Sequence, residues 1–445
     1  MALPRIVIVG AGFAGYHAAR TLSRLSRGRA EIALVNPTDY FLYLPLLPEV
    51  AAGVIDPRRV TVSLPETLPD VRLILGEADR IDVDARQVGW VDAEGSSGGC
   101  GYDRLVLAVG SVNKLLPIPG INEHAHGFRG ISEALYLRDH MTRQMELADL
   151  TDDAAERTAR TTFVVVGAGY TGTEVAAQGV LYTDVLYARH PRLRARPRWL
   201  LLDLADRILP ELDPRLSRTA DTVLRARGVD VRTGVSVREA RSEGVQMTDG
   251  EFVATRSLIW CVGVRPDPLI DEVGLKTERG RLVVDEYLTV PGHPEVYAVG
   301  DAAAVPDLTR PGEITPMTAQ HAQRQGKRAA HNIAASYGQG RRRPYKHHDL
   351  GFLVDLGGTQ AAADPVGVPL GGLPAKVVTR GYHLLALPGN RIRTATDWLL
   401  DAALSRQVVQ LGLVPPTAVE LECTAMQHRA PGPTPHADAT AEAHR

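Results

Sequence analysis

RIVIVGAGFAGYHAARTL, residues 5–22, and TFVVVGAGYTGTEVAAQG, residues 162–179, follow one plan. In each stretch a β-branched run stops at a glycine, and helix-forming residues come next, as in the strand-to-helix turn of a dinucleotide-binding unit. The turns GAGFAG and GAGYTG both fit G-x-G-x-x-G. One such motif is weak evidence, because glycine-rich turns also occur as plain structural turns. Two of them, each after a strand and before a helix, predict two dinucleotide-binding domains.

The three glycines of each motif have different tasks. The first makes the tight turn, the second lets the backbone approach a pyrophosphate, and the third lets the helix pack close to its strand. The phosphate charge then lies at the helix N-terminus, where the N–H groups are unpaired. The predicted phosphate-binding residues are Gly10, Gly12 and Gly15 in the first turn and Gly167, Gly169 and Gly172 in the second.

An acidic residue about 20 positions after such a motif binds the ribose hydroxyls of the nucleotide. After the second turn, Asp203 ends the strand RWLLLDLA, further along than usual because YARHPRLRARP precedes that strand as an inserted loop. A carboxylate there repels a 2′-phosphate, so the sequence favours NADH over NADPH, with Arg207 as the contrary signal. After the first turn the matching position holds Asn36, whose amide can bond a ribose but carries no charge.

Composition sets outer limits on the function. The chain has 445 residues, enough for about three domains, with 44% hydrophobic and 23% charged residues. A net charge of −2 gives no field that would attract nucleic acid. The 3 cysteines lie far apart without a CxxC, so the sequence predicts neither a dithiol centre nor a metal site, and a reducing, cytoplasmic compartment fits best. We predict no signal peptide and no spanning helix, so that any membrane contact is peripheral.

Four further stretches carry a resemblance to a known family. They are NPTDYFLYLPLLPEVAAG (36–53), GYDRLVLAVGS (101–111), YAVGDAA (297–303) and TAQHAQRQG (318–326). With the two glycine turns, they make the chain resemble the two-dinucleotide flavoprotein reductases, and most closely the type II NADH dehydrogenases, which are non-proton-pumping NADH:quinone oxidoreductases. The resemblance runs from about residue 4 to about residue 415.

The resemblance implies that FAD occupies the first turn and NADH the second. Gly110 would let the backbone pass the flavin, and Gly300 with Asp301 would hold its ribityl chain, although an aspartate-capped turn is the plainer interpretation of that pair. NADH would give a hydride to N5 of the flavin, and two electrons would then pass to a quinone.

Three residues are implied to be catalytic. Glu174 matches a family glutamate near the nicotinamide and flavin, although a solvent-exposed glutamate in the first helical turn is equally compatible with its position. Gln320 matches the first glutamine of the quinone-site signature A-Q-x-A-x-Q-x-G, and a polar residue packing near the flavin ring is its plainer interpretation. Arg324 replaces the second glutamine and shares a helix face with Gln320. Either side chain can donate to a quinone carbonyl, but Arg324 also suits an anionic acceptor.

The predicted fold class is α/β, with two Rossmann-like domains and a C-terminal region. We expect a FAD-binding domain made of residues 1–150 and 286–340, an NADH-binding domain inserted at 151–285, a membrane-association or dimerisation region at 341–428 and a disordered tail at 429–445. TDWLLDAALSRQVVQLGL (396–413) predicts a helix in this region. Its apolar stripe, which suits a membrane surface, a dimer interface or a core-facing helix, consists of Leu400, Leu404, Val408 and Leu411.

The leading hypothesis is therefore a homodimeric flavoenzyme on the inner face of the cell membrane that oxidises NADH and reduces a quinone. One alternative is a soluble NAD(P)H-dependent flavin reductase for a non-quinone acceptor, either a redox protein or a biosynthetic intermediate. A second is a flavoprotein that binds NADH as a redox sensor. Cysteines without a nearby partner count against disulfide reductase and sulfide:quinone reductase chemistry.

Overall fold

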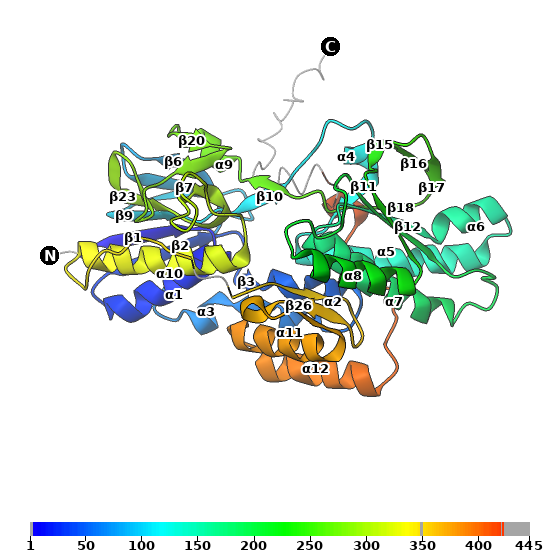
Figure 1. The fold of residues 1–445 in the computed structure, drawn as a ribbon. Helices are drawn as coiled ribbons and strands as arrows, with labels where there is room; N and C mark the ends of the chain where they lie inside the picture. Colours follow the sequence, from blue (N-terminus) through cyan, green and yellow to red (C-terminus); the bar gives the residue numbers. More distant parts are fainter. Residues whose placement is uncertain (1–2, 348–349, 420, 422–445) are drawn as a thin grey trace, which may run out of the picture.

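One mostly parallel sheet and one fully parallel sheet organise the molecule in the computed structural model, which describes residues 3–347, 350–419 and 421. The first sheet has the order β22-β23-β9-β1-β2-β5. Its last two strands in the chain therefore return to a sheet that the N-terminal segment began (Figure 1). Its strands are β1 (Arg5–Val9), β2 (Glu31–Asn36), β5 (Arg72–Leu75), β9 (Arg104–Leu107), β22 (Thr289–Val290) and β23 (His293–Ala298).

The second sheet has the order β11-β18-β12-β13-β14, and all its pairings are parallel. Its central strand β12 is buried along its whole length, because both faces of the sheet are covered. Phe163 and Val165 pack toward helices, whereas Val164 and Val166 pack toward the antiparallel strands that contain Val237, Val245 and Val253. The prediction of two Rossmann-like α/β units is confirmed. The strands are β11 (Ala125–Gly127), β12 (Thr162–Val166), β13 (Arg198–Asp203), β14 (Val229–Thr233) and β18 (Ser257–Trp260).

Long helices cover the sheets, and two of them, α1 and α7, begin at the glycine turns. In the first unit α1 and α10 lie side by side, and they approach closely because Gly326 has no side chain. A Cβ at this position would lie 2.0 Å from the carbonyl oxygen of Ala14. In the second unit α5, α7 and α8 pack on one face of the sheet (Figure 1). The helices are α1 (Phe13–Ser26), α5 (Ile131–Leu150), α7 (Tyr170–Tyr187), α8 (Pro214–Ala226) and α10 (Ala319–Ser336).

Two short antiparallel strands, β10 (Ser111–Asn113) and β19 (Val264–Pro266), join the two units. Figure 1 shows β10 between them. The other strands are β3 (Tyr40–Leu42), β4 (Thr61–Ser63), β6 (Glu77–Asp82), β7 (Gln87–Val91), β8 (Ser97–Gly101), β15 (Val237–Arg241), β16 (Gly244–Met247), β17 (Phe252–Ala254), β20 (Thr277–Glu278), β21 (Arg281–Val283) and β24 (Ala303–Ala304). The other short helices are α2 (Leu47–Ala51), α3 (Leu64–Thr67), α4 (Ile121–His124), α6 (Ala154–Arg160) and α9 (Leu269–Glu272), with the 3₁₀ turns η1 (Leu44–Leu46), η2 (Pro57–Arg59), η3 (Gly300–Ala302), η4 (Pro365–Gly367) and η5 (Pro416–Val419).

The C-terminal region packs below both units, against α2 and α7. It contains a three-stranded antiparallel sheet and two helices at the bottom of Figure 1. No helix among the described residues is both long enough and apolar enough to cross a bilayer. The elements are β25 (Leu353–Asp355), β26 (Ala361–Ala363), β27 (Leu370–Gly371), α11 (Gly372–Ala386) and α12 (Arg391–Ala403).

The predicted helix over 396–413 is wrong in its second half, because α12 ends at Ala403. Segment 404–421, which we call the strap, leaves the helix with Leu404 in an extended conformation. The strap runs back to α5, where the N–H groups of Leu411 and Gly412 donate to the carboxylate of Asp139 at 3.2 and 2.7 Å. Leu400, Leu404, Val408 and Leu411 therefore do not form one helical stripe.

The strap ends in the interior of the second unit, where Val419 and Leu421 are fully buried. Cys100 and Cys261 are free thiols, and no disulfide forms among the described residues. Cys423 and the predicted disordered tail at 429–445 lie outside the described part of the chain.

Candidate active site

The first glycine turn leaves an open space at the start of α1. A Cβ on Gly10, whose φ is +91°, would lie 2.5 Å from the carbonyl oxygen of Ala108, and one on Gly15 would lie 1.8 Å from the carbonyl oxygen of Gly10. A Cβ on Gly12 would meet nothing within 4 Å. Gly12 also caps α1 without a side-chain hydrogen bond, so the helix N-terminus faces this space. A dinucleotide phosphate fits such a cradle.

The second turn has the same geometry at the start of α7. A Cβ on Gly167, with φ +97°, would lie 2.3 Å from the carbonyl oxygen of Cys261, and one on Gly172 would lie 1.8 Å from that of Gly167. Gly169 caps α7, and a Cβ on it would meet nothing within 4 Å. The two turns are thus equivalent sites for a diphosphate.

The residues at the two strand ends also occupy equivalent positions. Asn36, at the end of β2, accepts the N–H of Ala11 at 2.8 Å through Oδ1. Asp203, at the end of β13, accepts the N–H of Ala168 at 2.5 Å through Oδ2. Each side chain therefore holds the residue after the first glycine of its own turn, besides the ribose contact that the sequence suggests.

Arg207 does not reach toward the nucleotide side of this turn. Its guanidinium donates to the carbonyl oxygens of Leu212 at 2.8 Å and Pro210 at 2.6 Å, so it closes its own loop. The guanidinium of Arg207, which could have favoured a 2′-phosphate, is instead bonded to its own loop, whereas Asp203 lies beside the glycine turn.

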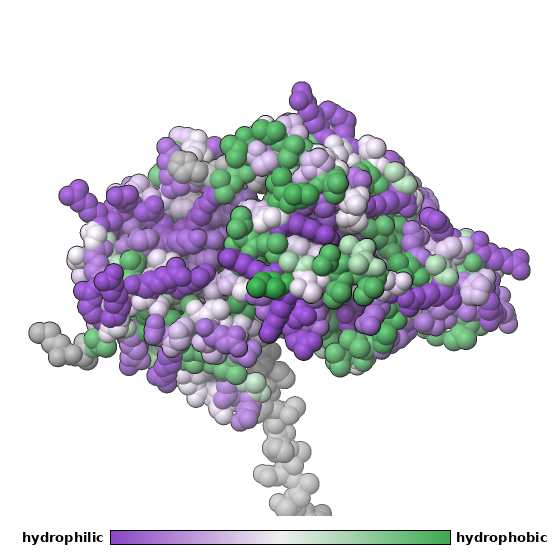
Figure 2. Space-filling view, turned by 90° about the horizontal axis from the view of Figure 1, so that it is seen from below, coloured by the Kyte–Doolittle hydropathy of each residue, from purple (hydrophilic) through white to green (hydrophobic). Residues whose placement is uncertain are grey.

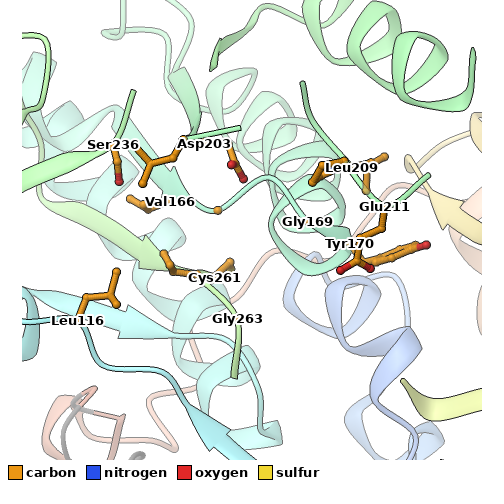
Figure 3. Close-up of a pocket in the computed structure, with 14 residues that line it drawn as sticks. Leu116, Val166, Gly169, Tyr170, Asp203, Leu209, Glu211, Ser236, Cys261 and Gly263 are labelled. Atoms are coloured by element: carbon orange, nitrogen blue, oxygen red, sulfur yellow. The ribbon is translucent and has the colours of Figure 1, made fainter. Parts of the chain in front are cut away.

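A cavity of about 300 Å³ lies against the second cradle. Its walls are mostly apolar, with few polar groups, which is typical of a cofactor site. Figure 3 shows Asp203 on one side of the turn at Gly169, and Tyr170 and Glu211 on the other. The lining residues are Leu116, Val166, Gly167, Gly169, Tyr170, Asp203, Leu204, Leu209, Pro210, Glu211, Ser236, Cys261, Val262 and Gly263.

Gly300 and Asp301 lie in η3, close to the linking strand β10. The Oγ of Ser111 donates to Oδ2 of Asp301 at 2.6 Å, and the N–H of Gly300, whose φ is +71°, donates to Oε1 of Gln325 at 2.7 Å. Gly110 has φ +82°, and a Cβ there would meet nothing within 4 Å. Backbone and carboxylate are therefore arranged around open space near the first unit.

The structure brings Glu174 and Gln320 to one short segment of the C-terminal region. Oε1 of Glu174, on α7, accepts the N–H of Asp355 at 2.8 Å, and Nε2 of Gln320, on α10, donates to the carbonyl of Gly351 at 3.0 Å. The Oε1 atom of Gln320 is buried and has no hydrogen-bond partner among the described residues. Two helices from different domains thus converge at the N-terminal side of β25.

Glu174 is partly buried, so the solvent-exposed alternative is wrong. Burial raises the pKa of Glu174 well above its usual value, and the neighbouring carboxylates of Asp355 and Glu49 add to the rise. Arg324 lies on the same face of α10 as Gln320, but its Nη1 is 3.0 Å from Nδ1 of His347 in the connector to the C-terminal region. It therefore sits beside, and not at, the segment that Glu174 contacts.

A buried charged cluster that the sequence did not reveal adjoins Glu174. Nζ of Lys376, on α11, lies 2.7 and 2.5 Å from the two carboxylate oxygens of Asp355 and 3.8 Å from Oε1 of Glu49. Oε2 of Glu49 accepts the indole N–H of Trp398, on α12. Burial raises the pKa of Glu49 to about 7, and the charge of Asp355 contributes. These residues are scattered through the sequence, and a buried lysine has no local signature, so only their packing identifies the cluster.

Comparison with known proteins agrees with this geometry. A family model described as pyridine nucleotide-disulphide oxidoreductase matches residues 4–326. The type II NADH:quinone oxidoreductase NdhA of Mycobacterium tuberculosis is 31% identical over 411 residues, covering 88% of this chain and 85% of the relative. The demethylphylloquinone reductase NdbB of Synechocystis is 30% identical over 410 residues, covering 89% and 96%.

A solved structure shares the whole architecture. NDH2 of Plasmodium falciparum, in complex with NADH, superposes with a TM-score of 0.84 at 18% identity, covering 92% of this chain and 100% of that chain. At this identity the likeness concerns the fold.

Proposed function

The chain belongs to the pyridine nucleotide-disulphide oxidoreductase family, among its type II NADH:quinone oxidoreductases, and from this premise we propose that it oxidises NADH and reduces a quinone. The observation that carries the proposal is the convergence of α7 and α10. Helix α7 begins at the glycine turn of the second unit, and α10 packs on α1, the helix that follows the glycine turn of the first unit. Glu174 on α7 and Gln320 on α10 both contact the segment Gly351–Asp355. Both nucleotide sites are thereby connected to one polar site.

The glycine cradles supply the two cofactor sites. Gly10, Gly12 and Gly15 would hold the diphosphate of FAD, and the second cradle with Asp203 would hold NADH, whose ribose hydroxyls suit a carboxylate. Bound FAD would supply the redox chemistry, taking a hydride from NADH and delivering two electrons to the quinone. The protein's part is to position both nucleotides and to handle protons.

Reduction of a quinone to a quinol consumes two protons as well as two electrons. Burial raises the pKa of Glu174 well above its usual value and so favours its protonated form, and the Lys376–Asp355 pair lies directly beside it. The buried amide of Gln320 can orient a carbonyl, and Arg324 offers a second donor one helical turn away. We therefore assign proton supply to Glu174 and acceptor orientation to Gln320 and Arg324.

The C-terminal region has an apolar face that suits contact with the lipid in which a hydrophobic quinone would be dissolved. Leu373, Val377 and Leu385 are 59, 64 and 77% exposed, and their spacing along α11 puts them on one side of the helix. Figure 2 shows hydrophobic side chains gathered across this underside of the molecule. We propose that this face rests on the inner surface of the cell membrane, with a homodimer interface as the competing use. The domain boundary expected at residue 151 is wrong, because β11 and α5 already belong to the second unit.

Steady-state kinetics would test the function. The purified holoenzyme should be yellow and should oxidise NADH much faster with a short-chain ubiquinone or naphthoquinone than with ferricyanide or a small redox protein. Glu174→Gln should slow quinone reduction by about tenfold or more, within the usual range for loss of a proton-transferring group. The matched change Glu211→Gln, in the nucleotide cavity, should affect the KM for NADH instead. Rapid turnover with the redox protein and none with quinones would favour the soluble flavin reductase.

A further inference from the structure

The strap ends against a glycine of the second unit, at a place where a side chain would crowd it. Gly127 is the last residue of β11, and a Cβ on it would lie 2.3 Å from Oε1 of Glu133 and 3.3 Å from Cδ1 of Leu421. Leu421 is fully buried. Just before it, the turn η5 packs on α5, and Val419 in that turn is fully buried as well. The end of the strap is therefore part of the interior of the second unit.

The position of Leu421 at Gly127 places it beside Trp260. Strand β11 pairs in parallel with β18, and Gly127 is the partner of Trp260 in this register. Trp260 is 2% exposed, and it belongs to the same apolar cluster as Leu421. The strap thus adds a buried aliphatic side chain to the surroundings of this indole.

Trp260 in turn holds the chain segment that follows the linking strand β10. Its indole Nε1 donates to the carbonyl oxygen of Lys114 at 3.1 Å, and the N–H of Lys114 donates to the carbonyl oxygen of Gly263 at 3.2 Å. Two residues further on, Leu116 lines the nucleotide cavity. The position of this wall therefore depends on the position of Trp260.

The cavity wall and the end of the strap also share one apolar cluster. Among the residues that line the cavity, Val166 lies in the buried part of this cluster, and Leu116 and Val262 pack against it. Figure 3 shows Leu116 and Val166 on the side of the view away from Tyr170. Because close-packed interiors transmit small displacements, a void at Leu421 would let this wall move.

The strap is itself held firmly on the second unit before it enters the interior. Nη2 of Arg189, which follows α7, donates to the carbonyl oxygen of Arg406 at 2.9 Å. Further along, the carboxylate of Asp139 accepts the N–H groups of Leu411 and Gly412. These bonds tie the strap to α7 and α5, so that its last residues meet the sheet at a defined position.

We propose that Leu421 is a positioning residue for NADH, which packs beside Trp260, fixes the Leu116 wall of the nucleotide cavity and so sets the affinity for the nicotinamide nucleotide. Leu421 does not line the cavity and acts through Trp260 and the segment 114–116. The proposal rests on the NADH part of the proposed function and is independent of the electron acceptor.

Nucleotide affinity of the FAD-loaded enzyme tests the proposal. The Kd for NAD⁺, which binds without reducing the flavin, would be measured by titration calorimetry, beside the KM for NADH and kcat with a water-soluble quinone analogue. We expect Leu421→Ala to raise the Kd and the KM about fivefold or more and to change kcat by less than about twofold, the pattern of weakened binding. Leu413→Ala is the matched control, because Leu413 lies on the same strap and is 68% exposed. It should leave all three values at the wild-type level.

Two further variants test the path of contacts. Trp260→Phe removes the N–H that holds the carbonyl of Lys114 but keeps an aromatic ring in the cluster, so it should also raise the Kd for NAD⁺. Leu421→Met conserves the volume of the side chain and should keep the Kd close to wild type.

The outcomes separate the alternatives. A lower unfolding temperature in Leu421→Ala with a wild-type Kd would show that the strap only stabilises the second unit, and it would overturn the proposal. A fall in kcat at unchanged Kd would also overturn it, because Leu421 would then act on electron transfer. If Leu421→Ala does not fold, Trp260→Phe decides, and a wild-type Kd in that variant rejects the role.

Failure of the proposed function would look different. A wild-type enzyme that binds NAD⁺ but reduces no quinone would count only against the proposed acceptor, since the Kd values would still decide the role of Leu421. A wild-type enzyme that binds no NAD⁺ would refute the NADH part of the proposed function, and the role of Leu421 with it.

Discussion

Gly12 and Gly15 belong to one motif but tolerate a methyl group very differently. Gly12 is extended, with φ −66°, and a Cβ there meets nothing, whereas on Gly15 it would lie 1.8 Å from a backbone oxygen. We expect Gly12→Ala to keep the fold and lose most bound FAD, because the methyl group enters the cradle. Gly15→Ala should instead destabilise the protein by about 1–3 kcal/mol, the usual cost of overpacking. Thermal unfolding and the FAD content per chain measure the two effects. Normal FAD content in Gly12→Ala would contradict the placement of the diphosphate.

Asp203 should decide which nicotinamide nucleotide is used. Replacing it with asparagine removes the charge that repels a 2′-phosphate but leaves an oxygen to hold the turn at Ala168. The ratio of kcat/KM for NADH to that for NADPH should fall about tenfold, which corresponds to roughly 1.4 kcal/mol. Asp206→Asn, an exposed change in the same loop, serves as control. An unchanged ratio in Asp203→Asn would mean that the ribose lies elsewhere.

Glu49 should make stability depend on pH. Its native pKa, raised to about 7 by burial, exceeds the unfolded value of 4.5, so the native state binds the proton more tightly. The resulting stability is present below pH 4.5 and is lost as pH rises toward about 7. Glu49→Gln keeps an acceptor for Trp398. We expect it to reduce the fall in the free energy of unfolding between low and neutral pH by on the order of 1–3 kcal/mol. Urea unfolding at pH 5 and pH 8 measures it, with exposed Glu66→Gln as control. Parallel pH profiles in wild type and Glu49→Gln would refute the assignment.

At the scale of elements, α11 has an apolar side that no described element covers. Leu373→Glu with Val377→Glu should reduce cosedimentation with lipid vesicles several-fold, because the charged side chains oppose insertion into the interface. NADH oxidation with a water-soluble quinone analogue should stay near wild type. The control pair is Leu150→Glu with Phe252→Glu, at sites 68 and 43% exposed on the second unit.

The same variants distinguish the two uses of α11. Loss of vesicle binding with an unchanged molar mass supports the membrane surface. Unchanged vesicle binding accompanied by a fall from dimer to monomer in sedimentation would instead assign this helix to a subunit interface.

At the scale of the whole molecule, the strap connects the C-terminal region to the interior of the second unit. A chain ending at residue 403 lacks Val419 and Leu421, both fully buried. It should lose about 3 kcal/mol or more, since each buried aliphatic side chain contributes about 1.5–3 kcal/mol. A chain ending at residue 421 is the matched control and should unfold like the full-length protein. Equal unfolding temperatures for all three chains would show that the strap adds no stability.

Local patterns anticipated the elements that form the cradles. The strands expected at RWLLLDLA and TTFVVVG are β13 and β12, and each glycine-to-helix turn is where the motif places it. The prediction of one helix over 396–413 was wrong because hydrophobic periodicity indicates which residues share an apolar face, but it does not show where the chain leaves the helix. The chain leaves the helix at Leu404 and is held to α5 by the hydrogen bonds of Leu411 and Gly412 to Asp139, a long-range contact that local periodicity does not encode.

From the sequence alone came the two dinucleotide folds, their glycines and the family, because tight turns and close helix packing demand particular residues at neighbouring positions. Tertiary structure alone decided which distant side chains meet. Lys376, Asp355 and Glu49 come from three separate segments. Such contacts depend on long-range packing and burial, which no local pattern encodes, and they set the charges around the proposed redox site.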